Sequence, residues 1–196
     1  MLAAAAGLCG LSLGGCVLRG LSGDEAAPVA TDPTLVAPSV GATDPVPLPQ
    51  PAPPPPKGAV DPMREVGHIR IPAIDVDETV WFGVSAPTID RGVAWWPGTA
   101  EFGHLGNVVL AGHRTDRPRP FYAVDLLVPG DRIILEAEGR EHTYEVTESF
   151  IVAPSALWIV GQSREHTLTL FSCHPLFSEA QRIVVRARLV SAPVDQ

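Results

Sequence analysis

The C-terminal part of the chain alternates between short apolar runs and breaks made by Gly and Pro, which is the pattern of an all-β fold. From about Met63 onward, β-branched and aromatic residues recur in runs of strand length. The candidate strands cover residues 68–71, 79–82, 93–95, 107–111, 132–137, 142–152, 167–172 and 182–189. About eight strands in a segment of this size predict a small barrel or sandwich.

Two connections between these strands carry their own signals. The stretch "EAEGREHTYEV" predicts a β-hairpin that turns at Gly139. The stretch after Pro120, "FYAVDLLVPGD", predicts one short helix, because Phe121, Val124 and Leu127 have the spacing of a single helical face.

The first eighteen residues are uncharged and end at Arg19. That length is at the lower limit of the roughly 17 to 25 residues that span a bilayer as a helix. Residues 1–19 are therefore expected to form a membrane anchor or a signal segment. An uncleaved anchor, a cleaved signal and a lipoprotein remain open, the last because "LGGC", ending at Cys16, resembles a lipobox.

Residues 20–61 are dominated by Pro, Ala, Val and acidic residues and contain no aromatic residue. Such a composition cannot form a core and favours extended polyproline II chain. We therefore expect a disordered Pro/Ala-rich linker over residues 20–61, and a folded domain over residues 62–196.

Charge and cysteine content narrow the possible functions. The formal net charge of -8 argues against a nucleic-acid partner, since phosphate binding needs a basic surface. Of the three cysteines, Cys9 and Cys16 lie in the N-terminal apolar segment, so the β domain contains Cys173 alone. An unpaired thiol outside the cytosol is prone to oxidation, which suggests that Cys173 has a chemical role.

Cys173 and His113 both lie where a predicted strand ends. "TLTLFSCHP" stops at Cys173, and "NVVLAGH" places His113 just beyond another strand. Cysteine is a nucleophile as the thiolate, and a nearby imidazolium commonly lowers its pKa. The alternative is that Cys173 is a small buried apolar residue without reactivity.

Arg182 is the third candidate. In "RIVVRARLV", alternation places Arg182, Arg186 and Arg188 on one strand face. The last two are expected on a solvated surface. Arg182 begins the strand after Cys173, so antiparallel pairing would place it beside the thiol, where a guanidinium can stabilise an acyl oxyanion.

Three segments in this order, "LAGHR", "LTLFSCHP" and "QRIVVRARL", resemble the sortases, cysteine transpeptidases of the Gram-positive cell surface. The flanking "WPGTA" and the "CHP" element look most like class E, the housekeeping type of high-GC actinobacteria, with class F next. The resemblance implies an eight-stranded sortase-type β-barrel with one or two short helices. It extends over essentially the whole domain from Met63.

The resemblance also implies roles. Cys173 would attack the Thr carbonyl of a C-terminal sorting signal of LAXTG or LPXTG type and form a thioester. His113 would protonate the departing amine and deprotonate the incoming one, and Arg182 would hold the substrate and the oxyanion. The partners would be secreted proteins that carry the signal, and a peptidoglycan-precursor or pilin amine. No cofactor or metal is implied. The domain would lie on the outer side of the cell membrane, and the N-terminal segment would attach it there.

Other interpretations remain. An L,D-transpeptidase would carry a Ser-His-Gly-Cys string, which is absent, and a papain-like protease would have its cysteine before its histidine. A zinc site built from His104, His113, Cys173 and His174 lacks the short paired spacings of structural zinc. A surface β domain without activity is the non-enzymatic alternative. His104 lies in a loop where it could contact substrate, and His174 is expected to point away from Cys173.

Overall fold

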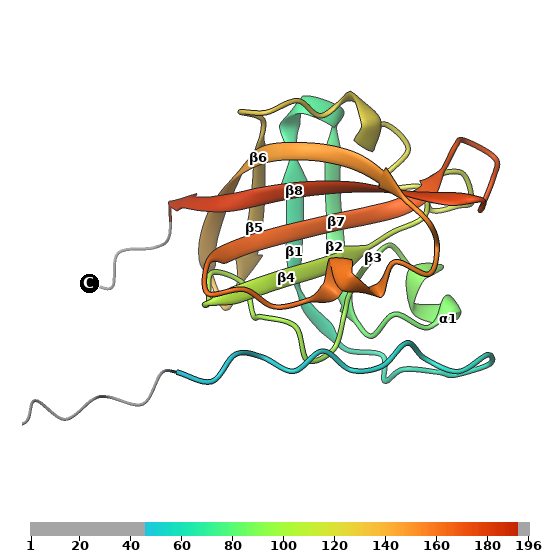
Figure 1. Ribbon diagram of the computed structural model, residues 1–196, viewed down its shortest axis with the longest axis horizontal. Coiled ribbons are helices and arrows are strands. Elements are labelled where there is room, and N and C mark those ends of the chain that lie inside the picture. Colours follow the sequence, from blue (N-terminus) through green and yellow to red (C-terminus); the bar gives the residue numbers. More distant parts are fainter. Residues whose placement is uncertain (1–45, 192–196) are drawn as a thin grey trace, which may run out of the picture. The chain divides into compact units, whose positions relative to one another are not determined.

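The computed structural model describes residues 46–191, which form one closed β-barrel (Figure 1). Its strands are β1 (Glu65–Ile71), β2 (Val76–Phe82), β3 (Val93–Trp95), β4 (Gly106–Ala111), β5 (Arg132–Ala137), β6 (Arg140–Val152), β7 (His166–His174) and β8 (Gln181–Ser191). The expected all-β barrel of eight strands is therefore confirmed, and every predicted strand lies within an observed one or coincides with it.

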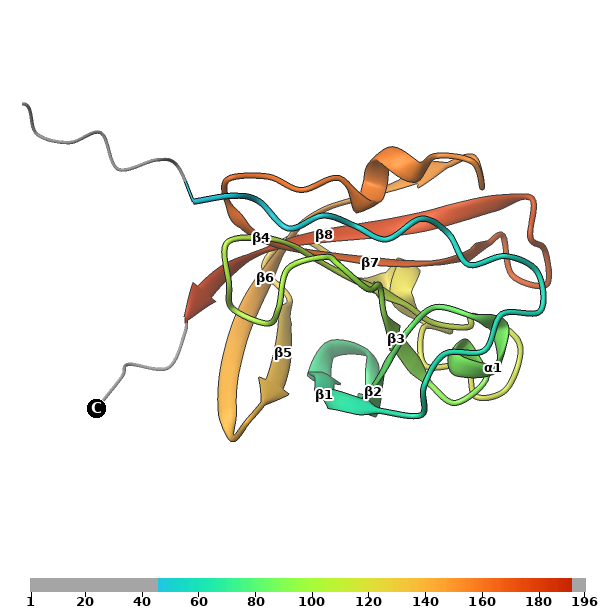
Figure 2. The ribbon, with the colours of Figure 1, turned by 90° about the horizontal axis from the view of Figure 1, so that it is seen from below.

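The order of strands around the barrel is β1-β2-β3-β4-β7-β8-β6-β5. Two neighbouring pairs, β2 with β3 and β4 with β7, are parallel, and the other pairs are antiparallel. Because β4 and β7 run the same way, their C-terminal ends lie at the same end of the barrel, where β8 begins (Figures 1 and 2). Segments that follow β4 and β7 are thus brought together although they are distant in the sequence.

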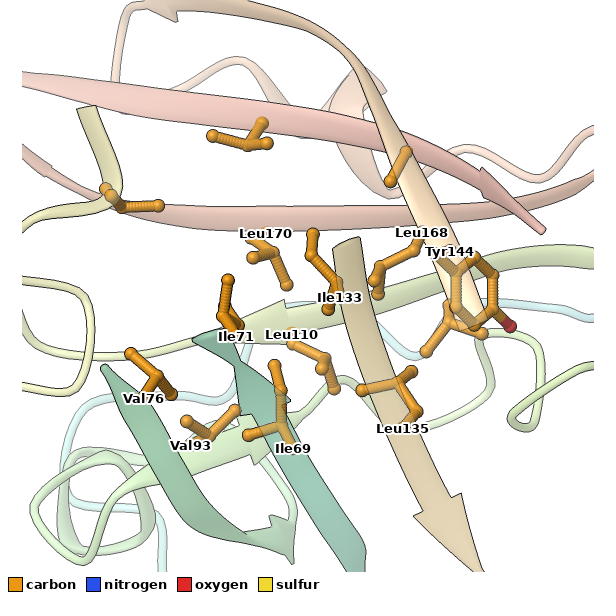
Figure 3. Close-up of a cluster of buried hydrophobic side chains, with 14 of the residues drawn as sticks. Ile69, Ile71, Val76, Val93, Leu110, Ile133, Leu135, Tyr144, Leu168 and Leu170 are labelled. Carbon is orange, nitrogen blue, oxygen red and sulfur yellow. The ribbon is translucent and has the colours of Figure 1, made fainter. Parts of the chain in front are cut away.

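Alternation along the strands fills the barrel interior. The inward side chains form one buried cluster, shown in Figure 3, with Tyr144 at its edge. Its labelled members are Ile69, Ile71, Val76, Val93, Leu110, Ile133, Leu135, Tyr144, Leu168 and Leu170. In β8, Ile183, Val185 and Ala187 belong to this cluster, as the alternation predicts.

A second apolar cluster lies on the outer side of the sheet. It contains Ala94 and Val109 from β3 and β4, Val184 from β8, and Ile159 and Val160 from the 3-10 turn η3 (Leu157–Val160). The connection between β6 and β7 therefore covers part of the outer face of β4, β7 and β8. This covered face is what makes Val184 buried although its neighbours in the alternation are arginines.

Helix is scarce. The single α-helix among the described residues is α1 (Ala86–Ile89), and η1 (Pro72–Ile74) is a further 3-10 turn. The helix expected after Pro120 is reduced to one 3-10 turn, η2 (Val124–Leu126), because Pro129 follows closely and restricts the residue before it. The predicted apolar face is confirmed, since Phe121, Val124 and Leu127 are all buried.

The hairpin between β5 and β6 turns where the sequence predicted. Glu138 and Gly139 occupy the turn with φ of 55° and 72°. Two consecutive residues with positive φ define a type I′ turn, whose twist matches that of the strands. Glycine supplies this conformation without steric cost at the second position.

Residues 46–62 form extended chain that follows the barrel surface (Figure 2). Ala52 exchanges hydrogen bonds with the segment after β3: its N–H donates to Pro97 O, and Trp96 Nε1 donates to Ala52 O, each at 2.8 Å. The last part of the predicted linker is thus in contact with the domain, and the remainder lies outside the described residues. So does the predicted membrane segment 1–19; within residues 46–191, no helix has the length and apolarity to span a bilayer.

Candidate active site

Cys173 lies one residue before the end of β7, half-buried, and is paired in register with Arg182 at the start of β8. Residues directly opposite each other on antiparallel strands share a sheet face. The side chains of Cys173 and Arg182 therefore lie on the outer face, beside Phe171 and Val184 of the second apolar cluster. The pairing predicted from the sequence is confirmed.

A hydroxyl joins the two segments that carry Cys173 and His113. Ser172 Oγ donates a hydrogen bond of 2.6 Å to the carbonyl oxygen of Gly112, the residue before His113. Gly112 is packed so closely that a Cβ would lie 2.9 Å from the Phe121 ring, so glycine is required there. The Ser172 hydroxyl thus makes a bond that keeps the two strand ends together.

His113 is held by a carboxylate that the sequence did not indicate. Nε2 of His113 lies 2.8 Å from Oδ1 of Asp90, the residue directly after α1. The side chain of His113 is 22% exposed. Its Nδ1 makes no hydrogen bond within residues 46–191. A histidine held at one ring nitrogen has the other nitrogen available for proton exchange.

Arg114 is a further residue that sequence reasoning missed. Its side chain is only 2% exposed, and its guanidinium is fully engaged: NH2 contacts Asp125 Oδ2 at 2.7 Å, NH1 lies 2.8 Å from His174 Nδ1, and Nε donates to Tyr122 O at 3.4 Å. A buried cation needs such partners. The signal available in the sequence was the arginine directly after the candidate histidine in "AGHR".

Arg114 also determines which ring nitrogen of His174 accepts. A guanidinium can only donate hydrogen bonds, so Nδ1 of His174 is the acceptor and the ring hydrogen resides on Nε2. The lone pair of His174 is therefore taken up by Arg114, and Nε2 already carries a hydrogen, so His174 has no nitrogen left to accept a proton from Cys173. This supports His113 rather than His174 as the acid and base.

The guanidinium of Arg182 is oriented by the loop between β7 and β8. NH1 donates to the carbonyl oxygens of Glu179 and Gln181, each at 2.9 Å. Both bonds come from NH1 and hold the planar guanidinium beside Cys173. Nε and NH2 of Arg182 make no hydrogen bond within residues 46–191. Such a group suits the stabilisation of developing negative charge on oxygen.

The environment of the thiol favours its protonated form. Burial raises the pKa of Cys173, the positive charge of Arg182 opposes this, and Glu179 and Asp116 add to the increase. The positive charge of Arg182 is thus the influence that favours the thiolate here. Attack by the thiolate requires proton transfer to a base as the substrate arrives.

The connection that covers the outer face is fastened at the start of β4, at the end of the barrel opposite Cys173. Asn107 donates from Nδ2 to the carbonyl oxygens of Ile159 and Gly161, both at 3.1 Å, and exchanges two backbone hydrogen bonds with the side chain of Gln162. The same loop presents Trp158, which is exposed and stacks on Phe150. The outer face next to Cys173 is apolar, since Phe150 and Phe171 pack against the second apolar cluster.

The remaining histidine of interest is far from the thiol. His104 precedes β4, whereas Cys173 lies near the end of the parallel strand β7, so the two lie at opposite ends of the barrel. His104 helps to line a cavity of about 580 Å³ together with Phe82, Trp95, Phe102 and His142. The zinc site considered from the sequence therefore cannot include His104. Within residues 46–191, no group of three or more potential ligands is arranged to hold a metal.

Comparison with known proteins agrees with this arrangement. The sortase domain family model matches residues 69–190. Sortase SrtE1 of Streptomyces coelicolor is 26% identical over 151 residues, covering 68% of this chain and 42% of the relative. Sortase SrtE2 of the same organism is 28% identical over 152 residues, covering 68% and 59%. The chain belongs to the sortase family, and these relatives agree with the expected likeness to class E.

Solved structures give the same result. A sortase D5 transpeptidase from Clostridium perfringens superposes with a TM-score of 0.61 at 27% identity, over 65% of this chain and 79% of that one. Sortase C1 of a group B streptococcal pilus island has a TM-score of 0.61 at 28% identity, over 67% and 66%. The chain spans about two fifths of the length of SrtE1 and three fifths of SrtE2.

Proposed function

We propose that this protein is a cell-surface cysteine transpeptidase that cleaves a C-terminal sorting signal of LAXTG or LPXTG type between Thr and Gly. The observation that carries the proposal is the pairing of Cys173 with Arg182 on the outer face, with His113 tied to the same barrel end through Ser172 and Gly112. Membership of the sortases, a family of cysteine transpeptidases, supports it.

The reaction has two balanced halves. Sγ of Cys173 attacks the Thr carbonyl carbon while its proton passes to His113, and Arg182 donates hydrogen bonds to the oxyanion. The Thr–Gly C–N bond breaks, the departing nitrogen takes the proton from His113, and a thioester remains. An incoming amine then gives a proton to His113, attacks the thioester and restores the Sγ–H group as the new amide forms.

The acceptor amine belongs to a peptidoglycan precursor or a pilin, so the product is a surface protein covalently fixed in the cell wall. This proposal places the barrel outside the cell membrane, with residues 1–19 as its attachment and the Pro/Ala-rich segment as the spacer. The class E resemblance favours LAXTG as the preferred signal. LPXTG is the second candidate.

Cleavage and transfer can be measured with two fluorescent peptides that contain LAXTG and LPXTG. With a short glycine peptide present, the protein should release the C-terminal fragment and yield the amine-transfer product. Cys173→Ala should reduce both to less than about 1% of wild type, because the loss of a covalent nucleophile usually costs several orders of magnitude.

The alternatives give different products. A protease would hydrolyse the peptide with little transfer to the amine, and an L,D-transpeptidase would act on neither peptide. A surface domain without activity would leave both peptides intact. Any of these results from folded protein with reduced Cys173 would contradict the proposal.

A further inference from the structure

Asp90 contacts the ring of His113 from a rigid part of the fold. Its Oδ1 lies 2.8 Å from Nε2 of His113. The backbone N–H of Asp90 caps α1 by donating to Ala86 O at 2.9 Å. The start of α1 is in turn held by Asp61, whose Oδ2 accepts from Ser85 N at 2.7 Å and Thr88 Oγ1 at 3.0 Å.

The Asp61 contacts leave little freedom at this helix. Gly83, just before it, packs against Asp61 so tightly that a Cβ would lie 2.0 Å from the Asp61 carboxyl carbon. Burial raises the pKa of Asp61, but its hydrogen bonds to Ser85, Thr88 and the Val84 backbone outweigh burial, and the net shift is downward. The carboxylate therefore stays charged at neutral pH, and it fastens the start of α1, the helix whose C-terminal end carries Asp90.

A carboxylate at Nε2 selects one form of the ring. Ionised Asp90 can only accept, so the hydrogen of His113 lies on Nε2 and Nδ1 carries the lone pair. Nδ1 is then the only ring nitrogen of neutral His113 that can accept a proton. Once the ring is charged, the same carboxylate stabilises the positive charge.

We propose that Asp90 is a positioning residue that holds His113 with hydrogen on Nε2 and leaves Nδ1 as the proton-exchanging atom of the reaction. The inference rests on the proposed transpeptidase function, because it assigns the atom through which His113 acts. Asp90 is 62% exposed, and ion pairs at such exposure contribute little to the free energy of unfolding. The main effect of Asp90 is therefore expected on the ring of His113 and not on stability.

The first test needs no substrate. In protein labelled with ¹⁵N-histidine, the His113 ring nitrogens are identified by their loss in His113→Gln. They are then recorded at a pH where their shifts no longer change. Wild type should show a protonated Nε2 and an unprotonated Nδ1. In Asp90→Ala the Nε2 hydrogen should exchange faster with water, and a form with hydrogen on Nδ1 should become detectable. A wild-type ring with hydrogen on Nδ1, or an unchanged spectrum in Asp90→Ala, would overturn the proposal.

The second test is kinetic and has a matched control. Asp90→Ala should lower kcat about tenfold or more with KM unchanged, and Asp90→Glu should recover part of the loss. The control is Asp77→Ala, which removes the carboxylate from another exposed Asp–His pair, that of Asp77 with His68 on β2 and β1. It should leave kcat unchanged.

The two tests separate two kinds of failure. If the peptides are not turned over but the tautomer responds to Asp90 as described, the proposed function is wrong and the positioning role stands. An effect of Asp90→Ala on KM alone, or an equal effect of Asp77→Ala on kcat, would contradict the positioning role even if the protein is a transpeptidase.

Discussion

The two ends of the barrel differ in what they offer to a ligand. At one end, the strands β4 and β7 finish and present His113 and Cys173, with Arg182 at the start of β8. At the other end, the β5–β6 hairpin and the loop before β4 surround a cavity of about 580 Å³. The cavity has the volume of a small-molecule site. Its histidines and carboxylates, however, face no nucleophile.

This difference shows that chemistry, rather than hollow volume, locates the site. Beside Cys173, the polar side chains have hydrogen-bond partners: Ser172 bonds to the Gly112 carbonyl, Asp90 to His113, and Arg114 to His174. At the cavity, Nδ1 of His142 is buried and has no hydrogen-bond partner among residues 46–191. Burial is the main reason that the pKa of His142 is lowered, with smaller contributions from His104 and Arg140.

The largest expected effect concerns Arg114 at the Cys173 end. Arg114→Met keeps the apolar stem but loses the contacts with Asp125 and His174, and it should cost about 3 kcal/mol of unfolding free energy. Peptide cleavage should fall as well, because the segment after His113 loses its anchor. The control is Arg188→Met toward the other end, whose exposed pair with Glu145 at 4.0 Å should contribute less than about 1 kcal/mol. Equal losses in denaturant unfolding would contradict the role of Arg114.

Arg182→Lys separates charge from geometry beside the thiol. If the guanidinium fork contacts the oxyanion, the lysine variant should lose about a hundredfold in kcat, equivalent to about 2.7 kcal/mol, with little change in stability. Initial rates of peptide cleavage measure this. Equal rates for the two proteins would reduce Arg182 to a source of positive charge. Because Arg182 lowers the pKa of Cys173, Arg182→Gln should also shift alkylation of the thiol by iodoacetamide to higher pH.

The smallest effect is expected at the cavity end, where Tyr144 is fully buried and its hydroxyl accepts from Gly103 N at 2.8 Å. Tyr144→Phe should cost about 1 kcal/mol of unfolding free energy and leave peptide cleavage unchanged. A loss of activity similar to that of Arg182→Lys would show that the two ends are not functionally separate.

The same tyrosine predicts a pH dependence. Burial raises the pKa of Tyr144 to about 12, against a hydrogen bond from Gly103 that lowers it. The unfolded state therefore ionises first, and the contribution of Tyr144 to stability is complete below pH 10 and is lost as the pH rises toward 12. The stability advantage of wild type over Tyr144→Phe should shrink over this range. An advantage independent of pH would contradict the assignment.

Strand positions could be predicted from the sequence because alternation and β-branched runs record the two faces of a sheet. For the same reason the Cys173–Arg182 pairing was predictable: a short loop between adjacent antiparallel strands leaves few registers. The helix after Pro120 was overestimated, since an apolar spacing of three residues is shared by a 3-10 turn and an α-helix.

Asp90 and Arg114 could not be assigned in advance, because their partners come from loops. Asp90 reaches His113 only because α1 is folded against Asp61, and Arg114 reaches His174 across sixty residues of chain. Neither path is encoded in a periodic pattern. The bond from Ser172 to Gly112 was likewise invisible, although the presence of a hydroxyl before Cys173 was not.

The most direct test of the account is the intact mass of the domain from about residue 46, which retains Ala52 and Asp61, after incubation with an LAXTG or LPXTG peptide and no amine acceptor. The mass should increase by that of the peptide up to and including Thr, and peptide mapping should place the addition on Cys173 as a thioester that hydroxylamine discharges. The Gly-containing tail should be released, faster from LAXTG. Absence of both the adduct and cleavage with either peptide, from folded protein whose Cys173 is shown to be reduced, would contradict the account.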